Sequence, residues 1–115
     1  RNAPYHGRGA GPFMIQHIVM LGLPEGYDAD ELDAVMQGLA ALDLPGFTGF
    51  THGPNRDLEH KTPDYPYGFI CTFTDTDALR IYAAHPGHKA LGGRLVALCG
   101  SGDAIMVIDL EVPTT

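Results

Sequence analysis

Hydrophobic and polar positions alternate in four segments of the chain, which is the pattern of β-strands. The first, residues 14–23 (MIQHIVMLGL), is apolar on both alternating faces. One face carries Ile15, His17, Val19 and Leu21, and the other carries Ile18 and Met20. A strand of this kind is covered on both sides. Further strands are predicted over 47–53, 67–73 and 103–112.

Between these strands, apolar residues recur with the period of a helix. A stripe at Leu32, Val35, Met36, Leu39 and Leu42 follows Asp28 and Glu31, which have the spacing of a capping box. A second helix is predicted to begin at 74–76. It must end near His85, because Pro86 lacks an N–H and disfavours a helical residue before it. Pro86 suits the first turn of a third helix over 86–99.

The predicted order is β-α-β-β-α(α)-β, which indicates an α+β, ferredoxin-like protomer with a four-stranded antiparallel sheet and helices on one face. Those helices cannot cover the second apolar face of residues 14–23. We therefore expect a second copy of the chain to bury it, as a homodimer.

The ends of the chain lack this periodicity. Residues 1–13 (RNAPYHGRGAGPF) are predicted to be a disordered N-terminal extension, residues 14–112 the domain, and residues 113–115 a tail. Residues 54–66 hold three prolines and five charges, so a long surface loop is expected between two strands.

Charge narrows the partners that the chain can have. The net charge of −7 over 115 residues, without a Lys/Arg cluster, argues against nucleic acid and against an anionic membrane surface. No apolar run reaches the length of a spanning helix and no signal-peptide pattern is present, so we expect no membrane association and a cytoplasmic location. Cys71 and Cys99 have no zinc-type spacing and are expected to be buried.

The segment YAAHPGH, residues 82–88, carries the candidate chemistry. A histidine with an ordinary pKa near 6.5 can remove an acidic C–H proton, and a tyrosine hydroxyl can donate to the oxygen that becomes negative. Tyr82 and His88 can serve in this way if the helix break folds His88 back under Tyr82. In the competing structural interpretation, Tyr82 packs in the core while His85 and His88 brace the helix junction.

A metal site is the weaker alternative. His85 and His88 have no carboxylate beside them, although His17 could supply a third imidazole across the fold. No cofactor is expected either, because the glycine patterns GRGAG and GG lack the strand-turn-helix context of a phosphate site.

Four segments, IQHIVML, LDLPGFTGFTHGPN, FICTFTDTDALRIYAAHPGHKAL and MVIDLEV, together resemble the stress-responsive α/β-barrel (Dabb) domain of the dimeric α+β barrel superfamily. The resemblance spans residues 14–112, and Y-x-x-H-P-x-H is its most specific element. It implies a ferredoxin-like protomer whose sheet packs face to face on that of a second copy, enclosing a barrel.

The family includes a plant polyketide cyclase that performs an intramolecular aldol condensation. Through it, the resemblance implies that Tyr82 and His88 are catalytic and that His17 lines the pocket, while Tyr67 replaces a further pocket histidine. We also count His85 and Asn55 as candidate ligand-binding residues, although Asn55 can instead order the turn after its strand.

The sequence leaves three functions open. The first is a homodimer that binds a small apolar or aromatic molecule in the barrel cavity near Tyr82, His88 and His17. The second is an enzyme, related to polyketide cyclases, that uses His88 and Tyr82 as an acid–base pair. The third is a purely structural stress protein whose dimer is its function.

Overall fold

The computed structural model describes residues 12–114, which form four strands and three α-helices. Their order is β1 (Phe13–Leu21), α1 (Ala29–Ala40), β2 (Phe47–Pro54), β3 (Tyr67–Phe73), α2 (Thr76–Ala84), α3 (Pro86–Cys99), a 3-10 turn (Gly102–Ala104) and β4 (Ile105–Pro113). This order confirms the predicted α+β, ferredoxin-like fold. Of the predicted extension, residues 1–11 lie outside the described residues, while Phe13 already belongs to β1.

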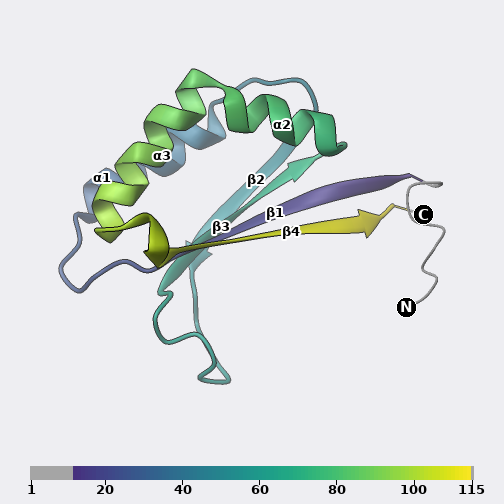
Figure 1. Ribbon diagram of the computed structural model, residues 1–115. Helices are drawn as coiled ribbons and strands as arrows, with labels where there is room; N and C mark the ends of the chain where they lie inside the picture. Colours follow the sequence, from purple (N-terminus) through teal and green to yellow (C-terminus); the bar gives the residue numbers. More distant parts are fainter. Residues whose placement is uncertain (1–11, 115) are drawn as a thin grey trace.

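The strands form one antiparallel sheet in the order β2-β3-β1-β4. The three helices lie on one side of it (Figure 1). β1 is hydrogen-bonded on both edges, so His17 lies between Cys71 of β3 and Asp109 of β4. Within residues 12–114, no helix is long and apolar enough to cross a membrane.

The core lies between the sheet and the helices. The alternating set of β1 faces it as predicted, with Ile15, Val19 and Leu21 buried, and α1 buries the apolar stripe from Leu32 to Leu39. Both cysteines are buried there. Three aromatic rings form the centre of one end of this core. Phe73 lies 5.0 Å from Tyr82 and 5.2 Å from Phe47 between ring centroids.

The helix ends show why each helix begins where it does. The Asp28 carboxylate accepts a hydrogen bond from the Glu31 N–H at 3.1 Å, which caps α1. The Glu31 carboxylate does not complete the predicted capping box. It accepts two hydrogen bonds from Arg94 of α3, at 2.7 and 2.8 Å, and so links α1 to α3. This ion pair also lowers the pKa of Glu31.

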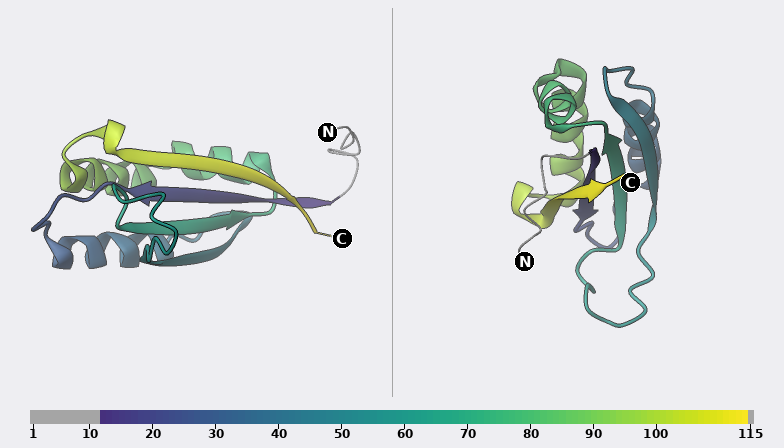
Figure 2. Two further views of the ribbon diagram at one scale, coloured as in Figure 1. Left: turned by 90° about the horizontal axis from the view of Figure 1, so that it is seen from below. Right: turned by 90° about the vertical axis from the view of Figure 1, so that its right-hand side faces the viewer.

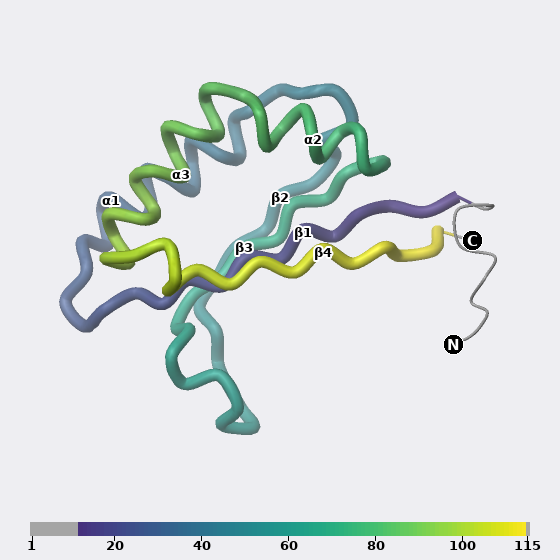
Figure 3. Tube along the Cα trace, in the orientation of Figure 1, coloured from purple at the N-terminus to yellow at the C-terminus, as the bar shows by residue number. Residues whose placement is uncertain are grey.

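The break between α2 and α3 follows the predicted proline (Figure 3). Pro86 is the first helical residue of α3, and the His85 imidazole Nδ1 accepts a hydrogen bond from the Gly87 N–H at 3.0 Å. His85 itself has extended backbone angles, with φ −69° and ψ 133°, as a residue before proline prefers. The chain therefore changes direction here without leaving the amide of Gly87 unsatisfied.

The second face of the sheet has no helices on it. An isoleucine row crosses it, because Ile18 of β1 is paired with Ile70 of β3 and with Ile108 of β4. Ile108 is 41% exposed and Leu110, on the same face of β4, is 47% exposed. We call this surface, formed by Ile18, Met20, Ile70, Met106, Ile108 and Leu110, the open face. It is the apolar second face that the alternation in β1 predicts.

The loop between β2 and β3 extends away from the helices (Figures 1 and 2). Its conformation is held by its own side chains. The Asp57 carboxylate accepts hydrogen bonds from the N–H groups of Lys61 and Thr62 and from the Thr62 hydroxyl, each at 2.8 Å, and these bonds lower the pKa of Asp57. The predicted surface loop is therefore ordered.

Gly46 provides a test of how tightly the turn into β2 packs on α2. Its φ is +75°, and a Cβ added there would lie 2.5 Å from the Ala78 Cβ. Gly26 has a similar φ of +78° with nothing within 4 Å. We expect Gly46→Ala to lower the free energy of unfolding by about 2–4 kcal/mol and Gly26→Ala by about 1 kcal/mol. Urea denaturation measures both, and equal losses would contradict the close contact at Gly46.

Candidate functional site

A cavity of about 370 Å³ lies between the sheet and the helices α2 and α3. Three polar aromatic side chains line it, namely His17 of β1, Tyr82 of α2 and His88 of α3. Most of the remaining wall is apolar: Val19, Phe69, Leu79, Ala83, Leu95, Val96, Ile105 and Val107. Gly92 and Lys89 of α3 complete the lining. A largely apolar cavity with a few converging polar groups is the usual form of a small-molecule site.

Tyr82 lies at the inner end of this cavity. Its side chain is 1% exposed, and its hydroxyl oxygen is 3.6 Å from the Cys71 thiol, which donates to it. Burial, which disfavours the phenolate, raises the pKa of Tyr82 well above its usual range. Burial likewise raises the pKa of the Cys71 thiol to about 11. The Tyr82 hydroxyl therefore keeps its proton at neutral pH and can donate a hydrogen bond.

His88 packs directly on Tyr82. The two ring centroids are 4.2 Å apart, and the His88 Nδ1 lies 3.3 Å from the carbonyl oxygen of Ala83. Because a carbonyl only accepts, this contact favours the tautomer with the proton on Nδ1 and leaves the Nε2 lone pair free. Burial lowers the pKa of His88 below 6.5. The imidazole is therefore neutral at pH 7, the form that a general base requires.

His17 completes the polar end of the cavity from the sheet. Its Nδ1 lies 2.6 Å from a carboxylate oxygen of Asp109, the residue opposite it on β4. The side chain of His17 is 12% exposed and that of Asp109 is 44% exposed. The carboxylate accepts from Nδ1–H, which fixes the tautomer of His17 and leaves its Nε2 free. The His17 ring meets the Tyr82 ring edge-on at 5.8 Å.

Sequence reasoning missed Asp109. The segment MVIDLEV contains two carboxylates, Asp109 and Glu111, and only the strand register shows that Asp109 is the one opposite His17. Only the pairing of β1 with β4 brings the two side chains together, and they are 92 residues apart in the sequence.

Three other predicted site residues lie elsewhere. His85 caps α3 through Gly87, as the structural interpretation expects. Tyr67 contacts His52 of β2, with its hydroxyl 2.6 Å from Nδ1 of that histidine. Asn55 orders the loop, donating to the Thr62 hydroxyl and to the Tyr65 carbonyl. The structure thus brings together His17, Tyr82 and His88 but not these three.

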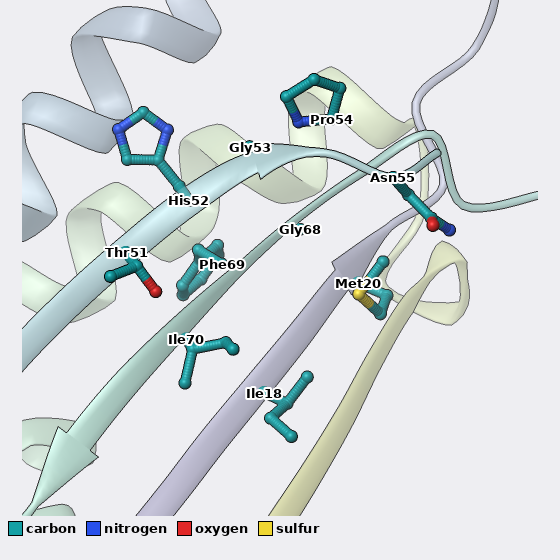
Figure 4. A pocket seen from close by; sticks show the side chains of 10 residues that line it. All are labelled: Ile18, Met20, Thr51, His52, Gly53, Pro54, Asn55, Gly68, Phe69 and Ile70. Atoms are coloured by element: carbon teal, nitrogen blue, oxygen red, sulfur yellow. The ribbon is translucent and has the colours of Figure 1, made fainter. Parts of the chain in front are cut away.

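The position of the cavity also differs from the expected one. The barrel of the resemblance would be enclosed between two open faces, whereas the cavity lies on the helix-covered side of the sheet. A separate hollow of about 270 Å³ does lie on the open face (Figure 4). It is formed around Ile18, Met20 and Ile70, with Asn55 at the end of β2. No group of three metal-ligating side chains occurs among residues 12–114.

Comparison with known proteins places the chain in a family. A family model described as Stress responsive A/B Barrel Domain (Dabb) matches residues 15–112. A dimeric ferredoxin-like protein of unknown function from Jannaschia sp. CCS1 is 51% identical, with a TM-score of 0.77 over 86% of this chain and 99% of that chain. No curated protein matches the chain.

Two further solved structures are similar at lower identity. A Dabb family protein with a ferredoxin-like fold from Mesorhizobium loti is 27% identical, with a TM-score of 0.69 over 90% of this chain and 99% of that chain. The protein At3g17210 from Arabidopsis thaliana is 25% identical, with a TM-score of 0.72 over 88% of this chain and 96% of that chain. The chain therefore belongs to the stress responsive A/B barrel domain (Dabb) family.

Proposed function

We propose that the protein is a homodimer that binds one small, largely apolar molecule per protomer in the cavity between the sheet and helices α2 and α3. The observation that carries the proposal is the wall of that cavity. Eight apolar side chains surround it while His17, Tyr82 and His88 converge at one end. An apolar wall supplies affinity, and a few polar groups orient the molecule.

Binding explains features that packing alone does not. The Tyr82 hydroxyl is buried, yet its only side-chain partner among the described residues is a thiol, which is a weak donor. The His17 and His88 rings each use Nδ1 for a protein contact, which leaves both Nε2 atoms available. A ligand carbonyl oxygen could accept from the Tyr82 hydroxyl, and a ligand hydroxyl could in addition donate to the Nε2 lone pair of His88.

The dimer rests on a different surface. The open face is too apolar and too continuous for a typical exposed sheet, and the related protein from Jannaschia is described as dimeric. Face-to-face packing of two open faces, with sheets roughly 10 Å apart, would bury the isoleucine row in both copies. Because the cavity is on the other side of the sheet, dimerisation and ligand binding would use separate surfaces.

A specific observation also favours catalysis as a second candidate function. His88 is held as a neutral base against a protonated phenol, with the His17–Asp109 pair across the cavity. His88 would take a proton from an acidic C–H group, and Tyr82 would donate a hydrogen bond to the oxygen that gains negative charge. The imidazole would return the proton at a later step.

The dimer can be tested with a charge in the isoleucine row. We expect Ile108→Lys to shift the protein from dimer to monomer, because two lysines would face each other across a dry interface. Ile81→Lys is the matched control, since Ile81 is similarly exposed on α2, away from the sheet. Size-exclusion chromatography with light scattering measures the mass. A monomeric wild-type protein, or a dimeric Ile108→Lys variant, would contradict the proposal.

Binding can be tested with N-phenyl-1-naphthylamine, a neutral aromatic probe whose fluorescence rises in apolar surroundings. We expect one probe per protomer and at least a tenfold weaker affinity in Leu79→Trp, because the indole would fill the cavity. Ile81→Trp carries the same residue on the outer side of α2 and should bind as the wild type does. Absence of binding to the wild type, or equal affinities in all three proteins, would favour a purely structural role.

Catalysis can be tested with 5-nitrobenzisoxazole, in which a base removes the proton on carbon 3 while the N–O bond breaks to give a nitrile and a phenolate. Because the pKa of His88 is lowered, the rate should rise with pH below 6.5 and be level near pH 7. His88→Gln should abolish this rate, whereas His60→Gln in the exposed loop should not. A rate equal to that of buffer, or one unchanged in His88→Gln, would count against a catalytic base.

A further inference from the structure

The solvent side of the cavity contains one permanent charge. Lys89 is the only lysine, arginine, aspartate or glutamate among the residues that line it. Lys89 is exposed, and so are Val96 and Val107, which together with Gly92 form the outer part of the lining. We call these four residues the mouth. Lys89, Gly92 and Val96 are spaced three and four apart on α3, so they lie on the same face of that helix.

Helix stability does not explain a cation at this position. Lys89 follows the capped end of α3 by four residues, near the positive end of the helix dipole, where a carboxylate stabilises and a cation does not. The first turns of α1 and α2 have acidic residues, whereas that of α3 has none. Lys89 also lowers the pKa of His88 through charge repulsion.

Ion pairing within the protomer does not explain it either. Arg80 pairs with Asp77, and Arg94 pairs with Glu31. Lys89 has no ion-pair partner among residues 12–114, although the chain has 14 acidic residues and only 7 basic ones. The carboxylate of Asp109, which lies beside His17 at the site, is already bound to that histidine.

Gly92 adds an opening beside this charge. It lies inside α3, where glycine is unfavourable relative to alanine, and a Cβ added there would meet nothing within 4 Å. Packing therefore does not demand glycine at this position. Gly93 is equally free of neighbours but does not line the cavity. The space above Gly92 is thus continuous with the mouth.

We propose that the mouth selects apolar molecules that carry one anionic group, which Lys89 binds while the apolar body passes Gly92 into the cavity. The inference rests on the proposed binding function and adds the class of ligand to it. An anion at the mouth and an apolar body inside would match the exposure of the lining, because Lys89 is exposed whereas Val19 and Phe69 of the sheet are buried. The chain as a whole is negatively charged and repels anions, so its overall charge would not account for a preference for anionic ligands.

Two probes with the same rings separate charge from apolar binding. 8-Anilinonaphthalene-1-sulfonate carries a sulfonate, and N-phenyl-1-naphthylamine is its neutral counterpart. We expect Lys89→Gln to weaken binding of the sulfonate probe roughly three- to tenfold and to leave the neutral probe unchanged. Added salt should weaken only the sulfonate probe. Lys61→Gln, which removes the same charge from the β2–β3 loop, is the control and should change neither.

A second pair of variants tests whether ligands enter beside Gly92. Gly92→Leu should weaken both probes at least tenfold, and Gly93→Leu, with the same substitution one residue on, should weaken neither. If the wild type binds neither probe, the proposed binding function fails. If the wild type binds both probes and Lys89→Gln changes the affinity for neither, the proposed binding in the cavity is supported and the proposed selection of anions is wrong. If Gly92→Leu and Gly93→Leu behave alike, the probes do not pass the proposed mouth.

Discussion

The structure depends on one strand that must be buried on both faces. β1 is paired with β4 along its whole length and with β3 from Ile15 to Leu21, and both of its alternating sets are largely apolar. Burial of an aliphatic side chain contributes about 1.5–3 kcal/mol, so leaving either set in water would cost a large part of the stability of a small domain. The helices cover the β1 side chains that lie on the same face as Val19. Those on the face of Ile18 belong to the open face, which the proposed second copy would cover. The two-sided strand thus accounts for both the fold and the proposed dimer.

The same strand provides the one polar position of the site on the sheet. His17 occupies an inward position where Ile15 and Val19 on either side are buried. An imidazole there would be costly without partners, and it has Asp109 at its Nδ1 and the rings of Phe73 and Tyr82 in T-shaped contact. From the helix side, the break at Pro86 brings His88 over Tyr82. The cavity therefore lies where His17, a polar residue in the apolar face of β1, is opposite the boundary between α2 and α3.

Most of the fold could be predicted because it follows from local patterns. The spacing of apolar residues predicts the strands and α1, and Pro86 predicts the boundary between α2 and α3. Because both alternating faces of β1 are rich in apolar residues, the sequence also predicts that the sheet has a second apolar face, the open face. What could not be predicted are the contacts that depend on register and on how the layers pack. Arg94 with Glu31, Asp109 with His17 and Tyr67 with His52 each join residues of different elements.

The candidate site shows the same division. A motif placed Tyr82 and His88 together, since they are six residues apart across one break, and the structure brings their rings into contact. The resemblance implies a pocket position for Tyr67 without showing which part of the sheet that residue occupies. Tyr67 faces the helices but lies two positions along β3 from Phe69, beside His52 rather than the cavity. A sequence motif fixes residue types and spacing, whereas membership of a cavity depends on the face and on the position along the strand.

The electrostatics of the cavity follow from its depth. At the inner end, desolvation keeps Tyr82 protonated and His88 neutral, and the Asp109 carboxylate is paired with His17. The solvent side holds Lys89, which has no ion-pair partner among residues 12–114 and is exposed, so it retains its hydration. A molecule that entered with its charge first would have to lose that hydration against an apolar wall, which is unfavourable. One that keeps its charge at Lys89 loses little, and its uncharged oxygen can meet the Tyr82 hydroxyl. The arrangement would therefore orient the proposed ligand by the cost of burying charge, before any specific contact is made.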